Sequence, residues 1–183
     1  MIKKKARPKP FFKKKIRPST FILFSLALIA ALLLFRKIAI YLLLTLFTST
    51  FVYANYYIKL PFDISPVLFL SLIISSEYGF VFAVFFIIAS GIIPMVMAGG
   101  SFDHTTLFYL SLIIGINLLN SHLVQYPFMI VAIPLVILHH ILGAVGSISF
   151  GTLLQKEILN LITQIIKDLF YILSFSKIVL GFF

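Results

Sequence analysis

Three histidines lie in a long uncharged part of the chain, and imidazole is the side chain most often used for metal binding and proton transfer near neutral pH. His139 and His140 are adjacent, and His122 lies in the preceding apolar segment. Neighbours on a helix point about 100° apart, so His139 and His140 are poorly placed to bind one ion together. Pairing His122 with either of them supplies two ligands, whereas a firm zinc site needs three or four. The sequence therefore predicts neither a metal site nor a cofactor.

Acidic and amide side chains near apolar segments are the second group of candidates. Asp63 and Glu77 flank a short apolar segment, and ionisable groups at membrane depth are functional candidates because hydrocarbon makes them costly. At segment ends they can also cap helices or face water; alternatively they line a cavity beside a short helix, where transporters place solute sites. Asn117 and Asn120, together with His122, form a polar patch that either bonds neighbouring helices or lines such a cavity.

Residue sets typical of enzymes do not emerge from the sequence. It contains no HExxH, no GxSxG, no glycine-rich phosphate loop and no cysteine. The apolar segments also bring no nucleophile and base together. We therefore expect the protein not to be an enzyme. An intramembrane metalloenzyme using His122 and His139 is the remaining catalytic hypothesis, and interhelical hydrogen bonding is the favoured role of these histidines.

Membrane-spanning helices are the elements that must position these residues. Hydrophobic residues make up 61% of the 183 residues and charged residues only 11%, against about 25% charged in ordinary globular domains. Residues 105–155 contain no Lys, Arg, Asp or Glu, which is long enough for two crossings of roughly 20 residues each and a turn. The sequence thus predicts an all-α, polytopic helical membrane bundle of about six transmembrane helices plus a C-terminal amphipathic helix.

Composition divides the chain into a basic tail (1–18), a six-span bundle (19–150) and a C-terminal amphipathic segment (151–183). The expected spans are residues 20–35, 38–55, 64–76, 79–98, 106–124 and 128–150. Arg36 and Lys37 would form the tip of a hairpin between the first two. In the last segment, polar residues recur every three or four positions, which predicts a helix with one polar face. We prefer to place it in the membrane interface; the alternative is a seventh span whose polar stripe turns into the bundle.

The basic tail predicts orientation and partners. It holds nine of the fifteen basic residues. Such a cluster beside a first span keeps the N-terminus inside, so we expect a multi-pass cell-membrane protein with a cytoplasmic N-terminus. Basic residues near the surface attract anionic lipid headgroups by about 1 kcal/mol each, which makes the lipid bilayer and its anionic headgroups the expected partners. Nucleic acid also attracts basic runs, but beside a membrane span it is the less favoured partner.

The segment around Pro66, Gly79 and Gly91 combines a proline-started short helix, a tight glycine turn and a span with a second glycine. In this outline residues 60–120 resemble MreD-type membrane proteins and the S-components of energy-coupling-factor vitamin transporters. The resemblance implies a compact six-helix bundle. The acidic residue that MreD-type proteins tend to carry after this span is replaced here by Ile-Ile-Pro at 92–94. The resemblance transfers no ligand-binding residue.

Two functions are compatible with these features. One is an S-component-like transport component that binds a small solute between its helices. The short third segment and the prolines at Pro94 and Pro134 favour it, because proline breaks can expose backbone groups to a cavity. The other is a non-catalytic scaffold that docks partner proteins, favoured by the polybasic tail and the amphipathic C-terminal helix. Broken helices have a specific use in transport, so transport is the preferred hypothesis.

Overall fold

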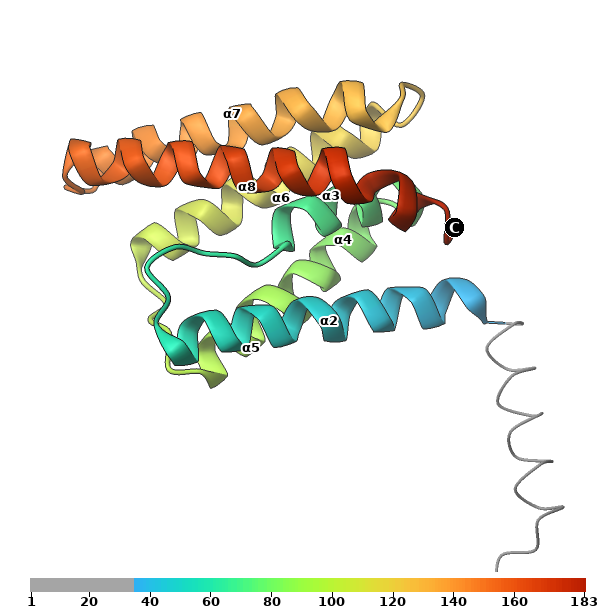
Figure 1. Ribbon diagram of the computed structural model, residues 1–183, viewed down its shortest axis with the longest axis horizontal. Helices are drawn as coiled ribbons and strands as arrows, with labels where there is room; N and C mark the ends of the chain where they lie inside the picture. Colours follow the sequence, from blue (N-terminus) through green and yellow to red (C-terminus); the bar gives the residue numbers. More distant parts are fainter. Residues whose placement is uncertain (1–34) are drawn as a thin grey trace, which may run out of the picture. The chain divides into compact units, whose positions relative to one another are not determined.

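The computed structural model describes residues 35–183, and these are helical apart from short connections (Figure 1). The basic tail and the predicted first span, except its last residue, lie outside the described residues. From residue 40 onward the chain forms one compact unit. The helices are α2 (Arg36–Ile58), α3 (Val67–Glu77), α4 (Phe80–Ile87), the π-helical turn η1 (Ile88–Ile92), α5 (Ile93–Met97), α6 (His104–His122), α7 (Phe128–Ser149) and α8 (Leu154–Leu180). The described part contains no strand, which confirms the predicted all-α class.

Within residues 35–183, four helices are long and apolar enough to cross a membrane. They are α2, α7, α8 and the continuous rod formed by α4, η1 and α5. The helix of the predicted third span, α3, has only 11 residues. The helix of the predicted fifth span, α6, forms as expected but is not among the four. Its amides, hydroxyls and histidines lower its hydropathy, and several of these side chains are directed to partners on other helices.

Large apolar side chains cover much of the outer surface of the described part, and several polar side chains are buried between its helices. Asn117 and Asp168 are 0% exposed, whereas Leu46 and Phe85 are 70% and 62% exposed. Exposed large apolar side chains continue along α2, α4, α7 and α8. Soluble monomers rarely expose apolar patches of more than a few hundred Å². An apolar outer surface with polar contacts between helices is the arrangement that a lipid environment favours.

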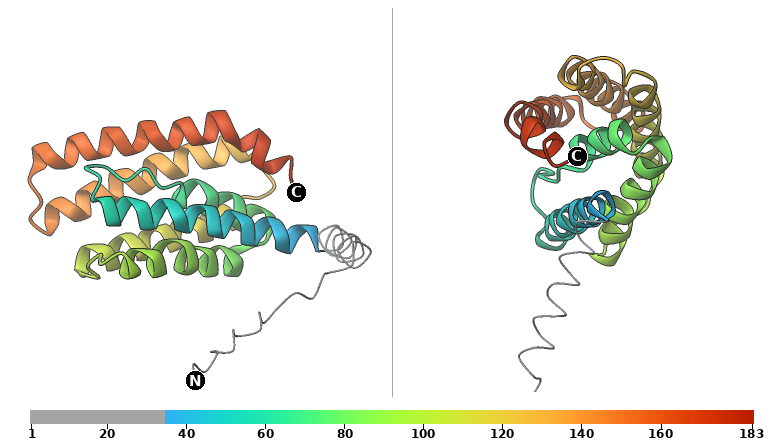
Figure 2. Two further views of the ribbon diagram at one scale, coloured as in Figure 1. Left: turned by 60° about the horizontal axis from the view of Figure 1, so that its bottom comes forward. Right: turned by 90° about the vertical axis from the view of Figure 1, so that its right-hand side faces the viewer.

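The short helix α3 lies in the middle of the unit (Figures 1 and 2) and contacts α4, α6, α7 and α8. All residues from Leu68 to Ser75 are buried. A helix enclosed by other helices needs no water-facing side, which explains why this segment is mostly apolar and why its buried serines find partners inside the bundle. Its shortness therefore reflects its place in the core of the bundle. The long helices α7 and α8 lie side by side in both figures.

The π-helical turn η1 directly precedes Pro94. Proline has no amide hydrogen, and its ring clashes with the carbonyl four residues earlier, here that of Ser90. A turn widened to bonds between residues five apart relieves this clash, and such turns are frequent at functional sites. The Ser90 hydroxyl donates to the Phe86 carbonyl at 2.7 Å. The predicted proline break is thus a bulge within a continuous helix.

Three helices end in the same type of turn, at one end of the unit (left in Figure 1). Lys59 after α2, Gly99 after α5 and Gly151 after α7 have left-handed backbones, with φ of 56°, 83° and 92°. The amide that follows each of them bonds to the carbonyl five residues earlier, at 2.9 to 3.1 Å. This is the Schellman C-cap. Glycine adopts it without a Cβ clash, so the strained position of the three is Lys59.

The C-terminal helix differs from the preferred prediction. An interfacial helix would turn its polar stripe to water, but α8 packs against α3 and α7. Its polar residues Glu157, Gln164, Asp168 and Ser176 are 5%, 8%, 0% and 1% exposed. These four side chains face the bundle, whereas Lys156, Asn160 and Thr163 of the same helix are exposed. The physical reason is that the stripe finds charged and hydrogen-bonding partners on α7 and in the loop before α3, as described next.

Candidate functional site: a polar cavity at one end of the bundle

A cavity of about 570 Å³ lies where α2, α5 and α7 end and α3, α6 and α8 begin. Its size is within the range of small-molecule pockets, about 300–1,000 Å³. Part of its wall is apolar, formed by side chains that include Val52, Ile87, Met95, Leu110 and Ile113. The ionisable side chains that line it, apart from tyrosines, are Asp63, Asp103, Glu157, Asp168, Lys156, Lys167, His139 and His140. Such a concentration is unusual in a chain with so few charges.

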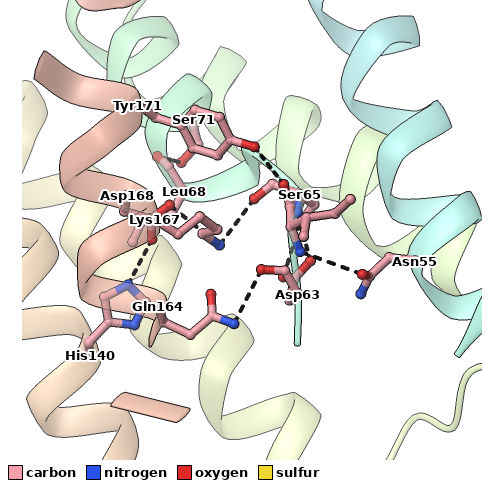
Figure 3. Close-up of polar contacts among 11 residues, drawn as sticks. Asn55, Asp63, Ser65, Leu68, Ser71, His140, Gln164, Lys167, Asp168 and Tyr171 are labelled. Atoms are coloured by element: carbon pink, nitrogen blue, oxygen red, sulfur yellow. Dashed lines mark hydrogen bonds and ion pairs between the residues drawn. The ribbon is translucent and has the colours of Figure 1, made fainter. Parts of the chain in front are cut away.

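Three side chains of α8 hold the loop between α2 and α3, which forms one wall of the cavity (Figure 3). Gln164, Tyr171 and Lys167 donate to the carbonyl oxygens of residues 63, 64 and 65, at 3.2, 2.7 and 3.2 Å. The spacing of the three donors places them on one face of α8. Carbonyls that are partly removed from water need donors, and an extended loop cannot supply them itself. The polar stripe of α8 therefore fixes the position of this wall.

A buried ionic contact joins α7 and α8 beside this loop (Figure 3). Nε2 of His140 lies 2.7 Å from Oδ2 of Asp168, and Nζ of Lys167 lies 3.4 Å from Oδ1. His140 donates through Nε2, because an ionised carboxylate can only accept. The Asp168 side chain is 0% exposed. A charge buried in this way is costly unless it is paired, so the imidazole and the ammonium are needed to keep the carboxylate there.

A second polar contact joins α6, α7 and α8. The Tyr109 hydroxyl lies 3.1 Å from Oγ of Ser147 and donates to Oε1 of Glu157 at 3.3 Å. Glycine on α7 makes room for this ring: a Cβ added at Gly143 would lie 2.5 Å from Cε1 of Tyr109. The close approach of α6 and α7 thus positions the Tyr109 hydroxyl against a buried carboxylate.

His139 lines the same cavity from α7 and is 7% exposed. Its ring centre lies 6.2 Å from that of Tyr109 and 5.0 Å from that of His140. Among the described residues, its Nδ1 has no hydrogen-bond partner, and neither does Oδ1 of Asp168. At the cavity, Nδ1 of His139 is therefore without a partner among the described residues, whereas Oδ1 of Asp168 has the Lys167 ammonium 3.4 Å away.

Asp103 begins α6 at the cavity and is its N-cap. The amide and the hydroxyl of Thr106 donate to its carboxylate at 2.8 and 2.9 Å. The bond from the amide is the main reason why the pKa of the Asp103 carboxyl lies below its usual range, and the hydroxyl bond adds to it. Hydrogen bonds to the ionised form favour that form, so Asp103 carries a negative charge at neutral pH.

Of the predicted site residues, Asp63 and His139 lie at the cavity. Asn117 and Asn120 are buried instead between α6 and α3. Nδ2 of Asn117 donates to the Ser71 hydroxyl at 3.0 Å, and Nδ2 of Asn120 donates to the Leu72 carbonyl at 2.8 Å and the Ser75 hydroxyl at 2.6 Å. Both amides therefore form hydrogen bonds between α6 and α3.

The remaining two predicted residues do not line this cavity. Glu77 is exposed at the end of α3, beside a smaller cavity of about 130 Å³ that Asn120 also lines. Nδ1 of His122 lies 2.8 Å from the Leu118 carbonyl of its own helix, and the residue is exposed. His122 is therefore not brought together with His139 or His140. In the described part of the chain, no group of three or more His, Cys, Asp or Glu side chains could hold a metal ion.

Sequence reasoning missed Glu157, Lys167 and Asp168 as site residues. Their spacing on one face of the C-terminal helix was visible, but the preferred prediction assigned that face to water. Interhelical hydrogen bonding is the predicted role of the histidines, and His140 makes such a contact, but its partner Asp168 cannot be identified without knowing that α8 packs on α7. Two sequence features together could identify this contact: the polar stripe of the C-terminal helix, and a histidine on an otherwise uncharged helix.

Comparison with known proteins adds no relative. No protein-family model matches the chain, and neither the curated proteins nor the solved structures contain a match.

Proposed function

We propose that this chain is a multi-pass membrane protein that binds a small polar solute in the 570 Å³ cavity and serves as a component of a transport system. The observation that carries the proposal is the cavity itself, lined by ionisable side chains and enclosed by helices whose outer surfaces are apolar. Ionisable groups inside a membrane bundle are expensive and mark solute or ion pathways. A chain that needed only to span the bilayer would gain nothing from them.

The scaffold alternative receives less support. It required a polar face on the C-terminal helix that partner proteins could bind. That face contacts α3, α7 and the loop before α3, and the outward side of α8 is apolar, as the exposure of Leu159 (69%) and Ile166 (62%) illustrates. A lipid-facing surface of this kind favours a place within the bilayer.

The proposed orientation follows from the basic residues. With the N-terminus in the cytoplasm of the cell membrane, the end of the unit that carries Lys59 and Lys156 faces the cytoplasm. The cavity lies at that end. The chain has no native cysteine, so single cysteines report orientation cleanly. A membrane-impermeant maleimide should label Lys156→Cys only after the cells are opened and Gln125→Cys from outside; the reverse pattern would refute this orientation.

Solute binding is tested on the full chain purified in mild detergent. Native mass spectrometry of the intact protein, followed by chemical analysis of the material released on denaturation, should detect a water-soluble small molecule at near-stoichiometric amount. Leu161 lines the cavity, and Leu159 lies on the outer side of the same helix. Leu161→Trp should fill the cavity and abolish the bound solute, whereas Leu159→Trp should leave it unchanged. No bound solute in the wild-type protein, or equal amounts in both variants, would contradict the proposal.

A further inference from the structure

We infer that the solute is a small organic cation, held through an ammonium group by the carboxylates of the cavity. The inference rests on the proposed function and names its substrate class. Three independent features of the cavity support it: its charge balance, the chemistry of its buried acceptor atoms and the composition of its wall.

Helix dipoles do not decide the sign of charge at this cavity. A helix carries about half a positive charge at its N-terminus and half a negative charge at its C-terminus. Here the N-terminal ends of α3, α6 and α8 meet the C-terminal ends of α2, α5 and α7. The partial charges of three N-terminal and three C-terminal helix ends therefore oppose one another. The side chains therefore determine which solute charge is favoured.

Those side chains leave an excess of negative charge. Lys167 and Asp168 form one ion pair, and the ammonium also donates to the carbonyl of residue 65. Three further carboxylates line the cavity, those of Asp63, Asp103 and Glu157, against the single further ammonium of Lys156. With neutral imidazoles, the lining carries a net charge of two negative units. Glu157 is 5% exposed, so this carboxylate is largely removed from water and acts at reduced dielectric.

The buried acceptor atoms are suited to a ligand that donates hydrogen bonds. Among the described residues, Nδ1 of His139 has no hydrogen-bond partner, and Oδ1 of Asp168 has only the ionic contact with Nζ of Lys167 at 3.4 Å. Both residues are more than nine-tenths buried and line the cavity. A carboxylate oxygen can only accept, and an imidazole nitrogen without a hydrogen does the same. An ammonium group has donors and no acceptors. It therefore complements the imidazole nitrogen and the carboxylate oxygen, whereas an ionised carboxylate or phosphate ligand would offer neither of them a donor.

The rest of the wall suits the body of an organic cation. Tyr56, Phe62 and Tyr109 line the cavity and can present aromatic faces, which attract cations within about 6 Å of the ring centre. Aliphatic side chains such as Ile113 and Met95 complete the wall and can cover an alkyl or aryl body. An inorganic cation would leave this apolar area unused.

The test uses two series of probes, each made of a cationic, a neutral and an anionic molecule of similar shape. The first series is benzylamine, benzyl alcohol and benzoate; the second is butylamine, butanol and butanoate. Binding to the full chain in lipid nanodiscs is measured by competition with the solute that co-purifies, detected by mass spectrometry. The amine of each series should compete at least about tenfold better than its alcohol, as one charge-assisted hydrogen bond predicts, and the carboxylate should compete worst. Equal competition by amine and alcohol, better competition by the carboxylate, or no competition by any probe would overturn the inference.

Three neighbouring variants on α8 supply opposite expectations. Glu157→Gln keeps an acceptor for Tyr109 and removes one negative charge, so it should weaken amine competition about tenfold and leave the alcohol unchanged. Lys156→Gln removes the opposing ammonium and should strengthen amine competition severalfold. Gln155, which does not line the cavity, supplies the control Gln155→Glu, which should have no effect. A co-purified solute that is neutral or anionic would refute this inference and leave the proposed function standing, whereas no bound solute of any class would refute both.

Discussion

Replacing Asp168 with Asn should strongly destabilise the protein, although the two side chains have nearly the same shape. The asparagine oxygen can still accept from Nε2 of His140, so that contact is kept. What disappears is the negative charge 3.4 Å from Nζ of Lys167. The ammonium is then left in a partly buried position, with its side chain 16% exposed, without an ionic partner among the described residues.

The charge separation sets the magnitude. Two unit charges 3.4 Å apart attract each other by about 5 kcal/mol at an effective dielectric of about 20. Desolvation offsets part of this, and removing one partner of a buried pair typically costs about 3–5 kcal/mol. We expect Asp168→Asn and Lys167→Gln each to lower the free energy of unfolding by about 3 kcal/mol, since the first variant leaves the ammonium and the second leaves the buried carboxylate without its ionic partner. The double variant should lose about 1–2 kcal/mol less than the sum.

The assay is reversible unfolding of the full chain by sodium dodecyl sulfate in mixed micelles, followed by far-ultraviolet circular dichroism. Asp103→Asn is the matched control: it is the same substitution at an exposed N-cap, where asparagine is about as good as aspartate, and should change stability by less than about 0.5 kcal/mol. If Asp168→Asn behaves like this control, or if the effects of Asp168→Asn and Lys167→Gln simply add, the ion pair does not contribute as argued here.

Three further predictions concern backbone and packing. Gly146→Ala should destabilise the protein by about 1–3 kcal/mol in the same assay, because the added Cβ would clash with the ring of Phe108. The control Gly115→Ala has open space around its Cβ and should be neutral or stabilise the protein by up to about 1 kcal/mol. Equal effects of the two variants would contradict the packing described here. Lys59→Gly should stabilise by about 1 kcal/mol by relieving a left-handed backbone, and a loss of stability would show that the lysine side chain matters more. A titration of Asp103 followed by carboxyl NMR should give a pKa below the usual range. The contribution of this carboxylate to stability is present above its unfolded-state pKa and is lost as the pH falls through its folded-state pKa. A normal pKa would show that the N-cap hydrogen bonds are absent.

The helices could be predicted from the sequence because their signals are local. Apolar runs bounded by polar residues placed α2, α4–α5, α6 and α7 close to their observed bounds. What could not be predicted was which partner each polar face meets. The stripe of α8 suits water and a polar bundle interior equally well, and only the carbonyls of residues 63–65 and the imidazole of His140 decide between them. Asp63 and His139 can therefore be identified from the sequence, whereas the α8 residues Glu157, Lys167 and Asp168 that complete the cavity cannot.

The contacts between α8 and residues 63–65 also determine when the site can assemble. Donor and acceptor are 101 to 107 positions apart in the chain, so every one of these bonds closes most of the described protein into a loop. Loop closure costs entropy before the contacts compensate for it, and the donors are on α8, which is synthesised after all the other described helices. Until α8 has entered the bundle, the wall before α3 has carbonyls without these donors and Asp168 has not reached His140. Maturation of the binding site is thus tied to insertion of the C-terminal helix, and a ribosome that stops early releases a chain with membrane helices but no finished cavity.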